Sequence, residues 1–204
     1  MKVLKKTVYE VEGFGLRLEP VEDTIKIKKT AKGFEVRYLT YDDNPFNPFE
    51  DDGNGKFYHW KDYGREQLER YCELLGYDTD TREKIKEDNP FAVRIDKYEH
   101  SGISYSVAGE GMQCRWDTSH TWAVWYPDAC AMEDIKRFKT KKTQRVRTVE
   151  LARQACELFN HWASGEVYCL VKEIFDKDKE SIDYDVCGGY FGRENAEKDL
   201  ETEV

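Results

Sequence analysis

The chain has 204 residues, a mass of 24.0 kDa and a net charge of −9. A mean hydropathy of −0.82 with 36% charged residues excludes an integral membrane protein, because a membrane-spanning helix needs about 20 nearly uninterrupted apolar residues. Aromatic residues make up 14% of the chain, and disordered chains lack the apolar surface that offsets the entropy lost on ordering. The composition therefore predicts a soluble, folded, acidic protein.

The charges are spread unevenly along the chain. Residues 136–147 include seven basic residues and no acidic one, whereas residues 42–52 contain no basic residue. The acidic side chains of the second segment are Asp42, Asp43, Glu50, Asp51 and Asp52. A net negative surface repels nucleic acid backbones and anionic membranes. Nucleic acid and membranes are therefore disfavoured as partners, and a cationic protein partner is favoured.

The first half of the chain is predicted to contain two hairpins, a long loop and a short helix. Alternating apolar and polar residues are typical of half-buried strands, and glycine marks the turns between them. Pro45 and Pro48 exclude a central strand or a helix interior between residues 42 and 55. Apolar residues at three- and four-residue steps predict a helix that Gly76 ends. The predicted strands are Thr24–Lys28, Gly33–Leu39, Phe91–Tyr98 and Ile103–Val107, and the helix is Gly64–Leu75.

The second half is predicted to contain an aromatic strand, long helices and two further strands. Pro127 ends the β-rich run Thr121–Tyr126, because proline cannot continue a central strand. Helical signals cover Asp128–Ser164, where one apolar stripe ends just before Gly165. The strands Glu166–Phe175 and Ile182–Phe191 follow. Residues 194–204 hold five acidic residues and one lysine, which predicts a surface helix or a frayed end.

This order of elements predicts an α+β fold, with a largely antiparallel sheet packed by one long helix and one or two shorter helices. The elements are neither a regular alternation of strands and helices nor strands alone. We expect residues 1–23 to form an N-terminal extension, residues 24–192 a single domain, and residues 193–204 an acidic C-terminal tail.

The cysteines indicate a reducing compartment. They are widely spaced and form no C-x-x-C pair, and the first six residues are too polar for a secretory leader. Thiols of this kind are expected to stay reduced in the cytoplasm. The six are Cys72, Cys114, Cys130, Cys156, Cys169 and Cys187.

Two patterns resemble metal sites, and both are incomplete. Glu50-x-Asp52-x-Asn54-Gly55 opens like a calcium loop, but Lys61 stands where the closing glutamate is needed. The spacing Cys114-x-x-Asp117-x-x-His120 offers three zinc-type ligands, whereas a structural zinc site needs four. We therefore expect a strong turn at residues 52–55, and we predict no bound metal and no cofactor.

A cysteine nucleophile is an alternative hypothesis. Cys114 or Cys187 would be activated by His100, with Asp117 nearby, and the glycines after Cys187 would supply amides for an oxyanion. The alternative without catalysis is a structural cysteine beside a strand bulge. An enzyme of this kind should gather His100, Cys114, Asp117 and the loop at Asp43 into one concave pocket.

Several short motifs of this chain occur together between residues 36 and 192. They are Asp43-Asn44-Pro45, Tyr98-x-His100-Ser101-Gly102, Cys114-x-Trp116-Asp117 with Trp125, Asn160-x-Trp162-x-x-Gly165-x-Val167-Tyr168, and Asp185-x-Cys187-Gly188-Gly189-x-x-Gly192. The set resembles a group of small proteins encoded by tailed phages and mobile elements. The resemblance implies an accessory protein in the host bacterial cytoplasm, and it implies no catalytic residues.

Two functions from different classes are carried forward. The favoured one is a non-enzymatic protein that binds a host protein, as an acidic, DNA-mimic-like inhibitor of a defence nuclease would. Its binding residues are expected to be the acidic side chains of residues 42–52 together with Trp116 and Trp125, the tryptophans being interface anchors only if they are exposed. The alternative is a small-molecule-binding or hydrolytic protein with a pocket around His100, Cys114 and Asp117.

Overall fold

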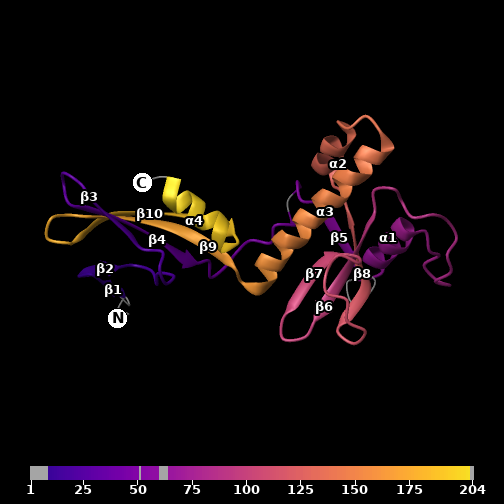
Figure 1. Cartoon of the computed structure of the whole chain (residues 1–204), viewed down its shortest axis with the longest axis horizontal. Helices are drawn as coiled ribbons and strands as arrows, with labels where there is room; N and C mark the ends of the chain where they lie inside the picture. Colours follow the sequence, from indigo (N-terminus) through magenta and orange to yellow (C-terminus); the bar gives the residue numbers. More distant parts are fainter. Residues whose placement is uncertain (1–8, 51, 60–63, 203–204) are drawn as a thin grey trace. The chain divides into compact units, whose positions relative to one another are not determined.

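A computed structural model describes residues 9–50, 52–59 and 64–202 of the chain. It divides into two compact units: unit 1 consists of Met1–Phe46 and His161–Val204, and unit 2 of Asn47–Asn160. In Figure 1, unit 1 carries the indigo and yellow ends of the chain, and unit 2 the magenta and orange middle. Residues 24–192, which the sequence predicts to be a single domain, are thus divided between two units that each have their own sheet and core.

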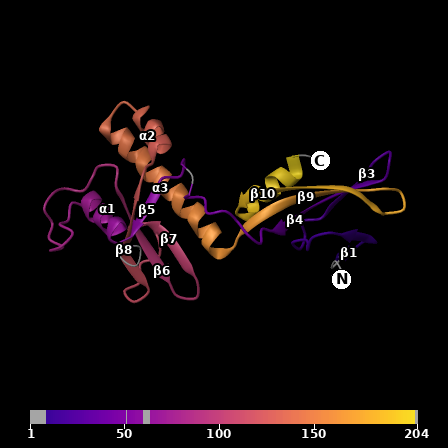
Figure 2. The same cartoon turned by 180° about the vertical axis from the view of Figure 1, so that it is seen from behind.

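Unit 1 is built on a four-stranded antiparallel sheet. Its strands are β3 (Lys26–Lys29), β4 (Phe34–Tyr41), β9 (Val167–Phe175) and β10 (Ser181–Phe191), in the order β10-β9-β4-β3. Strands β9 and β10 form a long hairpin, which can be followed from behind in Figure 2. The predicted hairpin of β3 and β4 is confirmed. Because β10 lies at the end of this order, one of its sides is an open sheet edge among the described residues.

Both faces of this sheet are covered. A second hairpin, β1 (Tyr9–Val11) and β2 (Phe14–Leu16), places Phe14 and Leu16 against Val171 and Phe175. On the other face, α4 (Arg193–Thr202) buries Ala196 and Leu200 against Leu39 and Leu170. The segments predicted as an N-terminal extension and an acidic tail therefore contribute to the core of unit 1. Consecutive apolar residues, such as Tyr38 and Leu39 on β4, point to opposite faces and are both buried, which explains why one sheet has two buried faces.

A charged group lies inside unit 1. Glu173 is fully buried on β9, and its Oε1 atom accepts hydrogen bonds from the Tyr38 hydroxyl at 2.6 Å and from the Arg17 backbone amide at 2.9 Å. The Arg17 guanidinium lies 3.7 Å from the other carboxylate oxygen. Burial, and then the hydrogen bond with Glu173, raise the pKa of Tyr38, so its hydroxyl keeps its proton and remains a donor. A buried carboxylate needs such partners to offset its desolvation.

Unit 2 contains another antiparallel sheet with helices on both faces. Its strands are β5 (Lys56–His59), β6 (Val93–Glu99), β7 (Ile103–Val107) and β8 (Thr118–Tyr126), in the order β5-β8-β6-β7. Helix α3 (Lys141–Ser164) buries Ala152 and Cys156 against one face. Helix α1 (Arg65–Leu75) packs on the face that carries Val124. The short helix α2 (Ala129–Lys136) begins after Asp128, whose carboxylate caps it by accepting the Ala131 amide at 2.9 Å.

The largest buried side chain of unit 2 anchors the loop before β5. Trp125 is 1% exposed, and its indole nitrogen donates a hydrogen bond to the Asn54 carbonyl at 2.8 Å. Gly55 has a φ of 72°, and a Cβ atom there would lie 2.5 Å from the Trp125 ring. A glycine is therefore required at this position, both for the backbone conformation and for the close approach of the ring.

The α+β class with antiparallel sheets is confirmed. The single predicted sheet is instead two four-stranded sheets and one two-stranded hairpin among the described residues. The helical signals across Asp128–Ser164 correspond to two helices, α2 and α3. Within the described part of the chain, none of the helices combines the length and apolar character that crossing a bilayer requires.

Candidate functional site

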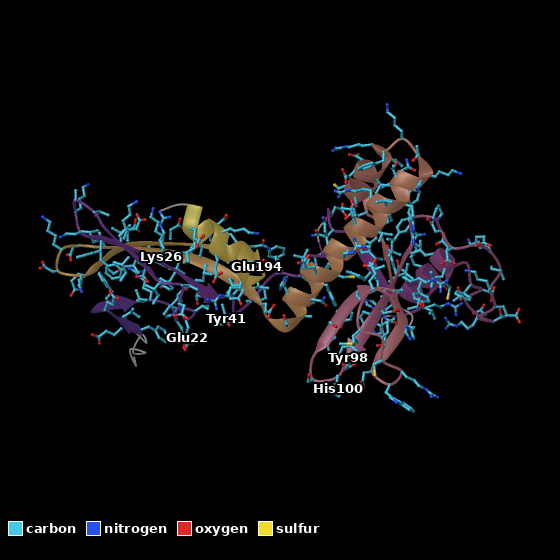
Figure 3. The ribbon with its side chains drawn as sticks, viewed as in Figure 1. Glu22, Lys26, Tyr41, Tyr98, His100 and Glu194 are labelled. Carbon is cyan, nitrogen blue, oxygen red and sulfur yellow. The ribbon has the colours of Figure 1, made fainter. Side chains whose placement is uncertain are left out.

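Three of the predicted catalytic residues lie together at one end of the unit 2 sheet. His100 is at the tip of the β6–β7 hairpin, where Figure 3 labels it, and Asp117 immediately precedes β8. The Glu99 amide donates to the Asp117 carbonyl at 2.8 Å, which holds the hairpin tip against this segment. Cys114 lies one turn earlier, and its amide donates to the Thr118 hydroxyl at 2.9 Å. The backbone thus positions all three side chains.

The carboxylate of Asp117 is the centre of this cluster. The Cys114 thiol donates to Asp117 Oδ2 at 3.2 Å, and His100 Nδ1 lies 3.4 Å from the same oxygen. The thiol and the imidazole therefore converge on the carboxylate and not on each other. A cysteine nucleophile needs a base that removes the thiol proton, with the imidazole as its direct partner. This geometry gives no support to the proposed Cys114–His100 pair.

The third residue of the zinc-type spacing contacts a different carboxylate. His120 lies beside the buried carboxylate of Asp96, 3.3 Å from its Oδ2 atom. No group of three or more His, Cys, Asp or Glu side chains in residues 9–50, 52–59 and 64–202 is arranged to hold a metal ion. The cavities that we describe, two in unit 2 and one in unit 1, are lined by other residues than His100, Cys114 and Asp117.

Cys187, the second candidate nucleophile, belongs to unit 1. It is exposed on β10, and the Tyr190 hydroxyl lies 3.8 Å from its sulfur atom. The register of β10 against β9 shifts between Cys187 and Tyr190, so the glycines that follow Cys187 form a strand bulge. This geometry supports a structural role for Cys187 beside a strand bulge.

The acidic loop is divided between the two units. Asp42 and Asp43 belong to unit 1. The Asp42 carboxylate accepts the Asn44 amide at 3.0 Å, and Asp43 lines a cavity of about 680 Å³ together with Arg17 and Arg193. Burial and then the Asp42 carboxylate raise the pKa of the Cys169 thiol to about 11. Cys169 therefore stays protonated near neutral pH.

The remaining acidic residues of the loop lie in unit 2, with the exception of Asp51, which is outside the described residues. Glu50 is exposed, and Asp52 lies 3.8 Å from Lys56. The turn that resembles a calcium loop binds a carboxylate of the protein itself: the Gly53 and Gly55 amides donate to Asp128 Oδ2 at 2.6 and 2.8 Å. Burial would raise the pKa of Asp128, but the Ala131, Gly53 and Gly55 amides outweigh it and lower that pKa. The chain bends at residues 52–54, with positive φ angles at Gly53 and Gly55.

The two predicted tryptophan anchors differ. Trp116 is 83% exposed, with the Arg115 guanidinium 5.1 Å from its ring centroid. Trp125 is a core residue, as described above, and is not accessible to a partner. Only Trp116 can therefore be an interface anchor, because an anchor must be reachable from solution.

The sequence analysis missed an accessible feature on the edge strand β10. Ile182, Tyr184 and Val186 are 60%, 47% and 38% exposed. Tyr184 and Val186 alternate with Asp183, Asp185 and Cys187, and each of these two sets lies on its own side of the sheet, whereas Ile182 lies in the register shift before them. The alternating run Ser-Ile-Asp-Tyr-Asp-Val was visible in the sequence, but only the strand order shows that it occupies an edge.

A partly buried histidine on β5 gives unit 2 a specific pH dependence. Burial lowers the pKa of His59 to about 4, whereas an unfolded chain has an ordinary histidine pKa of about 6.5. Between these values the unfolded chain binds more protons than the folded one, so acid favours unfolding. We expect the free energy of unfolding to fall by up to about 1.4 kcal/mol per pH unit from this group as the pH drops from 6.5 to 4. Above pH 6.5 the contribution is constant.

His59→Gln tests this prediction because glutamine does not titrate in that range. The difference in unfolding free energy between the variant and the unchanged protein should change with pH between 6.5 and 4, and should be constant above pH 7. Urea unfolding at a series of pH values measures it. Parallel pH profiles for the two proteins across the whole range would contradict the assignment.

Comparison with protein-family models, with curated proteins and with solved structures finds no match to this chain.

Proposed function

We propose that the protein is a non-enzymatic binding protein, and that it binds an extended, basic segment of a host protein along the edge strand β10. The observation that carries this proposal is the open edge itself, on which exposed apolar side chains line one face and carboxylates the other. Extended peptides bind such edges by adding a strand, so that main-chain hydrogen bonds give affinity and alternate side chains give specificity.

The two edges of the unit 1 sheet differ in character. Strand β3 is short and fully exposed, and three of its four residues are lysines, a composition that natural proteins use to prevent edge pairing. Strand β10 has eleven residues. Its register shifts near Ser181 and again after Cys187, and the stretch from Asp183 to Cys187 pairs regularly with β9 between these shifts. A regular, exposed edge of this length can accept one further strand.

The amides on the open side of β10 have replaceable partners. The Tyr184 amide donates to the Asp183 carboxylate, and the Val186 amide to the Asp185 carboxylate, each at 2.9 Å. Alternate residues of an antiparallel strand direct their polar groups to opposite sides, so these two amides face the open edge. A backbone carbonyl of an incoming strand can accept the hydrogen bond of each amide in place of the carboxylate. The two carboxylates are then released to pair with cationic side chains of the ligand.

The chemistry of the ligand follows from this exchange. Successive residues of a strand point to opposite faces, so lysine or arginine at alternate positions would meet Asp183 and Asp185. Apolar residues at the positions between them would cover Tyr184 and Val186. The Arg17 guanidinium lies 4.1 Å from the Tyr184 ring centroid and holds this ring in place. A second copy of β10 is disfavoured as the ligand, because it would bring like carboxylates together.

The phage resemblance supports a host protein as the source of this segment. Nucleic-acid-binding proteins carry clusters of lysine and arginine, so a host defence nuclease has the chemistry that the acidic edge would recognise. We propose inhibition of such an enzyme as the biological role. Its target should be captured from host lysate by the unchanged protein and lost with an altered β10 edge.

A labelled seven-residue peptide of alternating valine and lysine tests the binding chemistry by fluorescence anisotropy. We expect saturable binding that weakens when salt rises from 0.15 to 0.5 M, because exposed charge pairs are screened. Asp183→Asn with Asp185→Asn should weaken binding about tenfold or more, since each charged contact contributes about 1 kcal/mol. A peptide with glutamate in place of lysine, or with proline at its centre, should not bind.

The matched control is Asp178→Asn with Glu180→Gln, which removes the same charge from the turn of the same hairpin. We expect this variant to bind within about twofold of the unchanged protein, since neither residue belongs to β10. Equal losses of peptide affinity in both double variants would show that the peptide is held by general electrostatic attraction and not by the β10 edge. Absence of saturable binding would overturn the proposed edge site.

A further inference from the structure

We infer that unit 2 contains a small-molecule site for a ligand with one anionic group on an apolar, planar body, in a cavity at the start of helix α3. This inference is independent of the β10 edge, which belongs to unit 1. It also gives a role to the basic run of residues 136–147, which the proposed function leaves unused.

The cavity has a volume of about 620 Å³, within the range of about 300–1,000 Å³ that is typical of ligand sites. It lies where β6, the end of β7 and the first turn of α3 meet. Val93 and Val107 belong to the core between the sheet and α3, and the cavity extends this core to the surface. Its apolar lining consists of Pro90, Phe91, Ala92, Val93, Val107 and Ala108.

The charged lining of the cavity is predominantly cationic. Asp88, its one acidic residue among the described lining residues, is already paired with Lys84 and with Arg94, whose Nη2 lies 3.0 Å from the carboxylate. Lys141 and Arg145 line the cavity from α3, and the Asp88 carboxylate, which pairs with Lys84 and Arg94, also acts electrostatically on Arg145. Arg94, Lys141 and Arg145 outnumber the single carboxylate of Asp88 in this lining, and in a chain of net charge −9 such a local excess of cations beside an apolar cavity favours an anionic ligand.

Arg145 is held in a position from which it can bind such a ligand. Its Nη1 atom donates to the Pro90 carbonyl at 3.0 Å and to the Ala92 carbonyl at 2.8 Å. These bonds fix the guanidinium on the turn that forms the cavity wall. A guanidinium has five N–H donors, so Nε and Nη2 are left for a carboxylate or phosphate. The positive end of the 24-residue helix α3 adds to the attraction.

The two features together define the ligand class. An anion without an apolar body gains nothing from the wall of Phe91, Val93 and Val107, and a neutral apolar molecule gains nothing from Lys141 and Arg145. Only a molecule that combines both should bind well. A flat, rigid body suits such a site because it loses little conformational entropy on binding.

The test uses 2-naphthoate as the probe, with the neutral alcohol 2-naphthalenemethanol and with acetate as matched partial ligands. We expect 2-naphthoate to bind about tenfold or more tightly than either partial ligand, measured by amide chemical shifts. The largest shifts should occur at Phe91, Val107 and Gln144. Equal binding of the naphthoate and its alcohol would overturn the anionic part of the inference, and shifts confined to other residues would overturn the site.

Two neighbouring lysines supply a matched pair of variants. Lys141→Glu places a negative charge at the cavity, whereas Lys142→Glu makes the same change one residue away, outside the lining. Both side chains are exposed, so both variants should fold normally. We expect Lys141→Glu to weaken naphthoate binding about tenfold and Lys142→Glu to change it less than about twofold. The same loss in both variants would contradict a defined site.

Discussion

Replacing Trp125 by alanine is expected to lower the free energy of unfolding of unit 2 by about 3–5 kcal/mol, as large aromatic deletions in protein cores do. The ring packs in the cluster between the sheet and α3. Its indole nitrogen also holds the Asn54 carbonyl, so the variant loses an anchor of the loop before β5 in addition to core volume. Trp125→Phe should cost less, because it keeps part of the ring and loses the hydrogen bond.

Trp116→Ala is the matched control for this prediction. Its side chain is 83% exposed, and substitutions at exposed positions usually change stability by less than about 0.5 kcal/mol. Native-state hydrogen exchange of the β6 and β8 amides measures both variants in the sheet concerned. Similar losses for the two tryptophans would contradict their assignment to the core and to the surface.

Replacing Glu173 by alanine is expected to lower the free energy of unfolding of unit 1 by about 3–5 kcal/mol. The Tyr38 hydroxyl and the Arg17 amide would lose their acceptor inside the protein, and breaking a buried charged pair from one side costs about this much. Tyr38→Phe alone should cost about 1.5–3 kcal/mol, as hydrogen bonds to charged groups do. The hydrogen exchange of β4 and β9 amides reports both losses.

The double variant separates this network from simple loss of volume. Once Glu173 is alanine, Tyr38→Phe removes a hydroxyl that has no acceptor, so the two losses should sum to less than their separate values. Glu180→Ala, an exposed residue before β10, should leave the exchange rates nearly unchanged. Strict additivity of the two core variants would indicate that the hydroxyl and the carboxylate act independently.

Most of the secondary structure could be predicted because its signals are local. The strands β4, β6, β7, β9 and β10 and the helix α1 follow from periods of two and of 3.6 residues. Strands β1 and β2 have three residues each, too few to give a period. Their burial depends on Phe175, far along the chain. The same long-range packing divides the chain into two units, which no local pattern indicates.

For the candidate site, the sequence could predict only which residues lie together. The spacing of Cys114 and Asp117 and the position of His100 after a strand named residues that do lie together. The sequence could not show which of the three side chains the other two contact, because this depends on side-chain geometry. In the structure the Cys114 thiol and the His100 imidazole both contact the Asp117 carboxylate. The acidic residues at 42–52 were predicted as binding residues of one loop, but Asp42 and Asp43 belong to unit 1, whereas Glu50 and Asp52 belong to unit 2.

The central claim is that β10 accepts a further strand, and amide hydrogen exchange at its open side tests it most directly. With a saturating amount of the valine–lysine peptide, the Tyr184 and Val186 amides should become strongly protected, because peptide carbonyls replace the Asp183 and Asp185 carboxylates as acceptors. The amides of the lysine-rich edge β3 should exchange as before. Saturable peptide binding that leaves the Tyr184 and Val186 amides unprotected would contradict the account.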